Sequence, residues 1–182
     1  MSRILGTALR SPTVVIVMGV SGSGKTTIGT LLAKELNCSF LDADDFHPQA
    51  NVAKMVAGSP LTDEDRWPWL NILADKIRAH IAQQQSLILA CSALKKCYRQ
   101  ALCLDDKHVQ FVYLKGDYNT ICERLRSRES HFMDASLLDS QFAALEEPIN
   151  AIVVDIRADP TTNSELLREA LVKRSNDARL SV

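Results

Sequence analysis

Five short runs of apolar residues recur along the chain, separated by longer stretches of mixed character. Four runs are continuous and rich in β-branched residues: VVIVM (14–18), SLILAC (86–91), VQFVYL (109–114) and AIVVDI (151–156). A fifth, weaker run is SFLD (39–42). Runs of this type are typical of parallel strands that are covered on both faces. The pattern therefore predicts a central parallel sheet of five strands.

In the stretches between the runs, apolar residues recur with the spacing of amphipathic helices. Apolar residues spaced three and four apart form one stripe over 28–36 and another over 70–81. A further helix is expected around 51–57, and Asp117 is a good N-cap for one that begins just after it. Strands that alternate with helices indicate an α/β fold with crossover helices on the faces of the sheet.

Length and composition favour one domain. The chain has 182 residues, of which 46% are hydrophobic and 24% are charged, as in ordinary globular proteins. It shows no internal repeat and no linker long enough to separate two domains. We therefore expect a single domain over 1–182 with a core at about 14–174. The N-terminal extension 1–12 and the polar C-terminal tail are expected to be flexible.

Charge and cysteine content exclude several classes of partner. Twenty-one basic and 22 acidic residues give a net charge of −1, without a basic cluster that would bind a nucleic-acid polymer. No apolar segment approaches the roughly 20 residues that a membrane span requires. The five cysteines lack the spacing of a metal site, and we expect free thiols in a reducing, cytoplasmic setting.

The stretch GVSGSGKT (19–26) fits the phosphate-binding pattern G-x-x-x-x-G-K-[ST], between a predicted strand and a predicted helix. Its glycines let backbone N–H groups point at phosphate oxygens, beside the positive end of the helix. Lys25 would contact the β- and γ-phosphates of ATP as a catalytic residue, and the Thr26 hydroxyl would bind Mg²⁺. A glycine-rich turn without a ligand would not explain this lysine and the two hydroxyls after it. The expected ATP-binding residues are Gly19, Val20, Ser21, Gly22, Ser23, Gly24, Lys25, Thr26 and Thr27.

Two aspartates follow the run 39–42, in the segment DADDFHP. We expect this strand to lie next to the first one, with Asp42 and Asp44 on the same side if the extended conformation continues that far. Asp42 would then support the hydrated Mg²⁺ through water. Asp44 would be the catalytic base that accepts the proton of an attacking hydroxyl. The alternative is a solvated acidic loop with capping roles.

Polar residues farther along the chain favour a small anionic acceptor with many oxygens. Loops at the carboxyl edge of the sheet would bring several of them together, and an arginine pairs well with a carboxylate. Any one of them alone is more often ordinary surface charge. The substrate-binding residues expected from this part of the chain are Asp44, His47, Lys54, Arg66, Lys95 and Arg99.

The segment ERLRSRESHFMD places two arginines four residues apart, on one face of a helix that enters a polar turn. As catalytic residues, Arg124 and Arg128 would close over the transferring phosphoryl group and stabilise its charge. A helical lid over about 124–140 would also exclude water and suppress hydrolysis of ATP. The alternative is a solvated basic helix face.

Longer segments are similar to one known family. Five segments of the chain resemble, in their order and spacing, the gluconokinases of the small P-loop kinase type. They are MGVSGSGKTT, DADDFHPQANVAKMVAGSPLTDEDRWPWL, CSALKKCYRQAL, VYLKGDY and HFMDASLLDSQFAALEEP. The resemblance extends from about Val14 to Ile156, and HPxxNxxKM and PLxDxDRxPWL are more specific than the phosphate loop. Ala43 is a modest departure, because many relatives have glycine between the first two aspartates.

This resemblance implies an enzyme that transfers a phosphoryl group in line from Mg·ATP to the 6-hydroxyl of D-gluconate, giving 6-phosphogluconate. It also implies a three-layer P-loop kinase fold like that of nucleoside monophosphate kinases, with a helical lid, and a homodimer. His131 joins the substrate-binding residues with the lid on this ground alone.

Other interpretations stay open. A related small kinase would act on another sugar acid, shikimate or a nucleoside monophosphate with the same phosphate loop. A nucleotide-responsive binding module would keep the loop and transfer nothing. Loss of Lys25, the acidic pair or the lid arginines would favour such a module, and all of them are present. A purely structural role would not explain why so many polar residues gather at one edge of the sheet.

Overall fold

A five-stranded parallel sheet lies at the centre of the computed structural model, which describes residues 9, 11–104, 107–127 and 135–177. The strand order is β2-β3-β1-β4-β5, and all neighbouring strands are parallel. Each of the five apolar runs forms a strand that ends within one residue of its predicted bounds. The strands are β1 (Val14–Met18), β2 (Ser39–Asp42), β3 (Leu87–Ala90), β4 (Val109–Lys115) and β5 (Ile152–Asp155).

Helices fill the connections between these strands. Thr62 caps α3 through a reciprocal capping box with Asp65, and Asp117 caps α5 as predicted, by accepting from the Thr120 N–H at 2.9 Å. Among the described residues, no helix is long and apolar enough to cross a membrane. The helices are α1 (Lys25–Leu36), the 3-10 helix η1 (Ala43–Phe46), α2 (Gln49–Val56), α3 (Asp63–Ala82), α4 (Lys96–Leu102), α5 (Tyr118–Arg126), α6 (Ala135–Ala144) and α7 (Pro160–Asp177).

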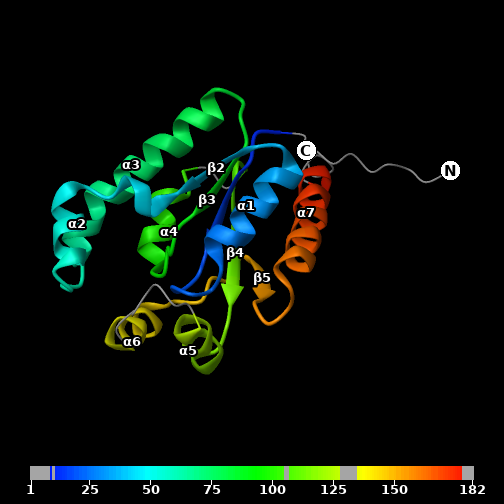
Figure 1. Ribbon diagram of the computed structural model, residues 1–182. Coiled ribbons are helices and arrows are strands. Elements are labelled where there is room, and N and C mark those ends of the chain that lie inside the picture. Colours follow the sequence, from blue (N-terminus) through cyan, green and yellow to red (C-terminus); the bar gives the residue numbers. More distant parts are fainter. Residues whose placement is uncertain (1–8, 10, 105–106, 128–134, 178–182) are drawn as a thin grey trace.

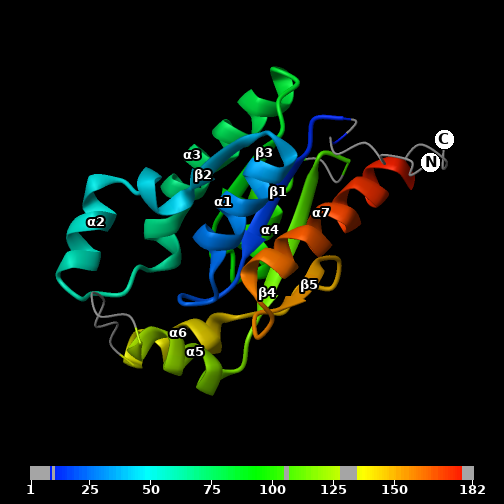
Figure 2. The same ribbon diagram turned by 45° about the vertical axis from the view of Figure 1, so that its right-hand side comes forward.

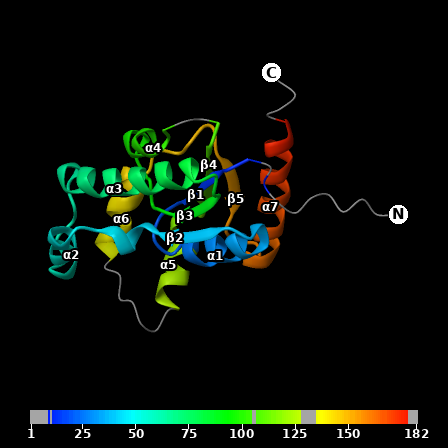
Figure 3. The same cartoon turned by 90° about the horizontal axis from the view of Figure 1, so that it is seen from above.

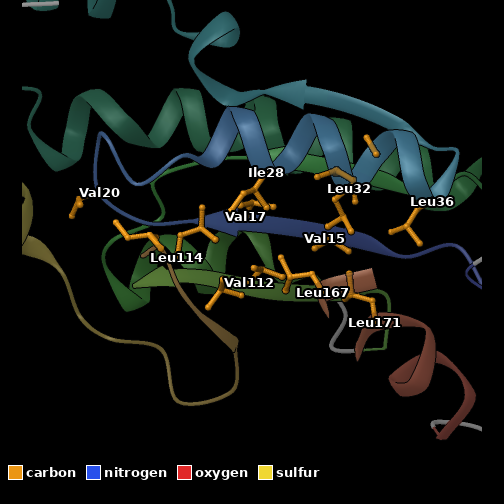
Figure 4. Close-up of a cluster of buried hydrophobic side chains, with 14 of the residues drawn as sticks. Val15, Val17, Val20, Ile28, Leu32, Leu36, Val112, Leu114, Leu167 and Leu171 are labelled. Atoms are coloured by element: carbon orange, nitrogen blue, oxygen red, sulfur yellow. The ribbon is translucent and has the colours of Figure 1, made fainter. Parts of the chain in front are cut away.

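The sheet is covered on both faces, which gives three layers (Figures 1 and 3). α1 and α7 pack together on one face, and α3 and α4 pack together on the other. The side chains of β1 alternate between the two: Val15 and Val17 join the cluster with α1 and α7 (Figure 4), and Val14 and Ile16 join the other. Packing on both faces therefore fixes the strand that leads into the phosphate loop, and the predicted α/β architecture is confirmed.

One predicted neighbour relation is wrong. β2 does not lie next to β1, because β3 lies between them and pairs with both. After β2 the chain passes through α2 and α3, and it returns as β3 between the first two strands. A local run of apolar residues carries no information on its neighbours in the sheet. Because all strands are parallel, the carboxyl ends of β1 and β2 still lie at the same edge.

This carboxyl edge collects the loops that carry the predicted site. The phosphate loop follows β1, η1 follows β2, and the connection to α4 follows β3. In Figure 1, α5 and α6 lie beyond the carboxyl end of β4. Figure 2 shows α2 standing out from the sheet on the side away from α7. We call the part of this edge around α1 and α5 the nucleotide side, and the part around η1, α2 and the start of α3 the acceptor side, after their predicted roles.

Candidate active site

Backbone geometry makes the loop 19–24 a concave turn. Gly19 has φ 145°, and a Cβ there would lie 2.9 Å from the Leu114 carbonyl oxygen. Gly24 has φ 95° and precedes α1 without a side-chain cap. Both φ angles lie in the region that favours glycine. The first N–H groups of α1 have no carbonyl partner within the helix, so they point outward at the end where anions bind.

Lys25 opens α1, and its Nζ donates to the Val20 carbonyl at 3.2 Å. The ammonium group therefore lies over the loop. A cation above a cradle of N–H groups is the arrangement that binds the terminal phosphates of a nucleoside triphosphate.

A hydrogen bond joins the phosphate loop to the acidic turn. The Thr26 hydroxyl donates to Oδ2 of Asp42 at 2.8 Å, and Oδ1 of Asp42 accepts from the Asp44 N–H at 3.2 Å. β2 ends at Asp42 and Asp44 lies in η1, so the predicted extended conformation does not continue to Asp44. The side chain of Asp42 itself stabilises this turn, by capping η1.

The oxygens of Thr26 and Asp42 suit Mg²⁺, which prefers hard oxygen ligands. Among the described residues no group of three His, Cys, Asp or Glu side chains could hold a metal ion. Mg²⁺ at this position would therefore take most of its ligands from phosphate oxygens and water, as is usual for this ion.

Asp44 is an exposed carboxylate of the acidic turn. Its side chain is 85% exposed, so a ligand can reach it. The pKa of Asp44 is raised by partial desolvation and then by the nearby charge of Asp42, although the side chain is largely exposed; Lys25 and His47 act in the opposite direction. A raised pKa suits a group that accepts a proton.

Two lysines predicted to bind substrate are held by acids at the start of α3. Nζ of Lys54 lies 2.7 and 2.8 Å from the two carboxylate oxygens of Asp65. Nζ of Lys95 lies at the same distances from those of Asp63, which also accepts from the Tyr98 hydroxyl. Hydrogen bonds to these partners lower the pKa of both aspartates and raise that of Lys95. The first turn of α3 thereby links α2 to the connection after β3.

The two arginines of the acceptor side differ in their surroundings. Arg66 donates to the Leu61 carbonyl, and its guanidinium lies 5.8 Å from the centre of the Tyr98 ring. Arg99 is only 9% exposed and donates to the carbonyls of Ala93 and Leu94, at 3.0 and 2.8 Å. Burial lowers the pKa of Arg99. Its contacts in this structure support the β3–α4 connection, and its contact with substrate stays a prediction.

Arg124 lies on the nucleotide side. It donates to the Ile156 carbonyl and borders a cavity of about 140 Å³ beside the phosphate loop. Arg128 and His131 are outside the described residues. A larger hollow of about 520 Å³ lies by the loops around 37 and 85, and it shares no residue with the loop 19–24. The small cavity is lined by Ser23, Gly24, Thr27, Ile28, Arg124, Ile156, Ala158, Pro160 and Asn163.

Several contacts were not predicted from the sequence. Gln141 in α6 accepts from the Ser21 N–H at 2.7 Å, and its Nε2 donates to Ser21 Oγ at 3.2 Å. No local pattern marks a glutamine in a helix as a partner of a loop 120 positions earlier. Asp63 and Asp65 lie in the first turn of α3, where acidic residues commonly stabilise the start of a helix. The sequence therefore does not indicate that they also form ion pairs with Lys54 and Lys95.

Comparison with known proteins agrees with this geometry. The family model described as shikimate kinase matches residues 21–171. The thermosensitive gluconokinase of Escherichia coli strain K12 is 45% identical over 161 residues, which are 86% of either chain. The gluconokinase of Gluconobacter oxydans strain 621H is 44% identical over 89% of this chain and 90% of its own.

A solved structure supports the same assignment. The crystal structure of a gluconokinase from Sinorhizobium meliloti 1021 superposes with a TM-score of 0.85 at 34% sequence identity, over 94% of this chain and 98% of the other. These matches to gluconokinases each cover more than four fifths of this chain. The chain belongs to the gluconokinase family, within the wider shikimate-kinase-like group of P-loop kinases.

Proposed function

We propose that the protein phosphorylates D-gluconate at its 6-hydroxyl with ATP, giving 6-phosphogluconate and ADP. The observation that carries this proposal is the hydrogen bond from Thr26 to Asp42. It holds the phosphate loop and the acidic turn together, so that Asp44 lies at the acceptor side of a phosphate site. The gluconokinase relatives, named for this activity, match most of the chain.

ATP would bind with its phosphates in the loop 19–24 and at the N-terminus of α1. Lys25 would bind the terminal phosphates, and its charge matters most as negative charge develops on the transferring group. The cavity between the loop and Arg124 is a fitting place for the base or sugar of the nucleotide. Thr26, and Asp42 through water, would hold Mg²⁺, which neutralises phosphate charge when bound.

Gluconate would bind on the acceptor side, with its 6-hydroxyl at Asp44. Asp44 would orient this hydroxyl and accept its proton during in-line transfer. The cations Lys54, Arg66, Lys95 and Arg99 would supply a positive environment for the carboxylate of the substrate, and His47 lies beside Asp44. An ammonium group has three N–H donors, so Lys54 and Lys95 can keep their aspartates and still donate to a ligand.

We further propose that the single domain closes a lid over about 124–140, which includes Arg124, Arg128 and His131. Closure would exclude water while the phosphoryl group is transferred. We also propose the homodimer that the family resemblance implies. Light scattering of the purified chain tests the dimer, and a monomer at all concentrations would contradict it.

ADP release from purified protein with Mg·ATP tests the activity. D-gluconate, other sugar acids, shikimate, nucleoside monophosphates and no acceptor are compared side by side, and mass spectrometry identifies the product. We expect ADP release that depends on gluconate, and little ADP release without an acceptor. Release with a different acceptor only would overturn the substrate. No release with any acceptor would favour a binding module.

A further inference from the structure

His47 lies in a buried polar group beside the acidic turn. Its side chain is 6% exposed, although the sequence predicts that it binds substrate. Asn51 and Trp69 contact it and are each 3% exposed. His47 follows η1, Asn51 belongs to α2 and Trp69 to α3. We call these three residues the His47 group, and its burial indicates that it acts through a neighbour.

Hydrogen bonds donated by the Asn51 amide assign the tautomer of His47. Nδ2 of Asn51 donates to the Asp65 carbonyl at 2.8 Å; a carbonyl oxygen only accepts, so this atom is the amide nitrogen. The same nitrogen lies 3.4 Å from Nδ1 of His47. Its second N–H is therefore directed at Nδ1, which must carry the lone pair. In the neutral ring the hydrogen then lies on Nε2.

Nε2 of His47 faces the acidic turn. It lies 3.9 Å from Oδ1 of Asp44, which is beyond hydrogen-bond distance, so the N–H and the carboxylate interact through their charges and dipoles. Burial, and the charge of Arg66, lower the pKa of His47, and Asp44 acts in the opposite direction. The net lowering favours the neutral ring at neutral pH, which agrees with the tautomer assigned from Asn51.

Trp69 fixes both the ring and the turn. Its indole N–H donates to the Ala43 carbonyl at 2.8 Å, inside η1. Its ring stacks on that of His47 with centroids 4.3 Å apart and planes 15° apart. One side chain of α3 thus holds the histidine and the backbone that carries Asp44. Core packing alone would require neither this hydrogen bond nor the position of His47 Nε2 beside Asp44.

We propose that the His47 group positions Asp44. Asn51 and Trp69 hold the imidazole in one tautomer and one orientation, and the His47 N–H attracts one carboxylate oxygen of Asp44. The other oxygen is then directed at the acceptor hydroxyl. The catalytic consequence rests on the proposed function, in which Asp44 accepts the proton of that hydroxyl.

Nitrogen NMR of the full chain tests the tautomer of His47 and does not depend on enzymatic activity. Long-range ¹H–¹⁵N spectra at neutral pH should show a protonated Nε2 and an unprotonated Nδ1 for His47. His47→Gln identifies the signals. In Asn51→Asp, a carboxylate replaces the donor, so we expect the hydrogen to move to Nδ1. A protonated Nδ1 in the unchanged protein would overturn the proposal, whatever the enzyme does with gluconate.

Steady-state kinetics test the consequence. Trp69→Phe keeps a stacked ring but lacks the N–H, and His47→Phe keeps the ring but lacks the directed donor. We expect kcat for gluconate to fall about tenfold or more, within the hundred- to ten-thousandfold that a placed base contributes, with KM for ATP little changed. Trp67→Phe and His80→Phe are matched controls from the same helix and should keep the full kcat.

The outcomes separate the two proposals. An unchanged kcat in both Trp69→Phe and His47→Phe, with gluconate turnover intact in the unchanged protein, would overturn the positioning role. A lower kcat together with a raised KM for ATP and a lower melting temperature would indicate a structural role, and would also overturn it. If no acceptor supports turnover, the proposed function fails, and the NMR result still decides the arrangement of His47.

Discussion

The nucleotide side and the acceptor side of the carboxyl edge are built in different ways. On the nucleotide side, the groups that would face phosphate are mostly backbone N–H groups and two side chains from eight consecutive residues, 19–26. On the acceptor side, charged side chains from α2, α3 and the β3–α4 connection hold one another in pairs. A local motif can thus specify a phosphate site, whereas an acceptor site depends on long-range packing. Four changes would break or sharpen this comparison.

The largest effect is expected from Lys25→Ala on the nucleotide side. The change removes a charge that matters most in the transition state, so kcat/KM should fall at least about a hundred- to thousandfold. Circular dichroism and melting should stay normal, because the loop itself is formed by the backbone. Lys34→Ala, at the other end of α1, is the matched control. Normal turnover in Lys25→Ala would refute the assignment of the phosphate loop.

Asp44→Asn should affect the acceptor chemistry alone. We expect kcat to fall about a hundredfold or more, because an amide cannot accept the proton of the hydroxyl. The dissociation constant of ATP, measured by calorimetry, should change little. Asp45→Asn alters the next residue in the same turn and should retain activity. Nearly unchanged turnover in Asp44→Asn would show that another group is the base.

A smaller effect is expected from Asp63→Asn, which breaks the ion pair with Lys95. The lysine loses its fixed position, so KM for gluconate should rise about three- to tenfold, the range of one or two hydrogen bonds. KM for ATP should stay the same, since the phosphate loop does not depend on this pair. Asp75→Asn removes an exposed ion pair of the same helix as a control. An equal rise in both KM values would mean that the two sides are not independent.

The smallest effect concerns stability in acid. The pKa values of Asp63 and Asp65 are lowered from 3.8 in the folded protein, so their ion pairs stabilise it above that pH. The stabilisation by these ion pairs is lost as the pH falls from 3.8 through the lowered pKa values of the two aspartates, because the carboxylates become protonated. Thermal melting between about pH 5 and pH 2 should show a shallower loss for Asp63→Asn/Asp65→Asn than for the unchanged protein. Parallel curves would contradict the linkage.

The sequence predicts the fold well where the signal is local. The five apolar runs give the strands, and Asp117 gives the start of α5. The position of β3 between β1 and β2 could not be predicted, because strand order depends on the path of the whole chain. The end of β2 at Asp42 agrees with the predicted run 39–42, and the local hydrogen bond from the Asp44 N–H to Asp42 turns the chain there.

The candidate site likewise has parts that the sequence predicts and parts that it does not. The phosphate loop is recognisable from eight residues, and the acidic turn from the strand that precedes it. The partners of Lys54 and Lys95 could not be predicted, since the aspartates of α3 also satisfy the rules for helix caps. The contact from Gln141 to Ser21 joins distant segments with no shared pattern. Such contacts depend on packing, which a single sequence does not reveal.

The place of β3 between the first two strands has a consequence for synthesis of the chain. As the protein leaves the ribosome, β1 and β2 emerge before either of the strands that pair with β1, since those are β3 and β4. The apolar residues of β1, fully buried in the finished fold, therefore stay unpaired while α2 and α3 are still being translated. Non-local pairing of this kind is slow and exposes aggregation-prone segments. The growing chain should therefore depend on chaperones until β3 is complete.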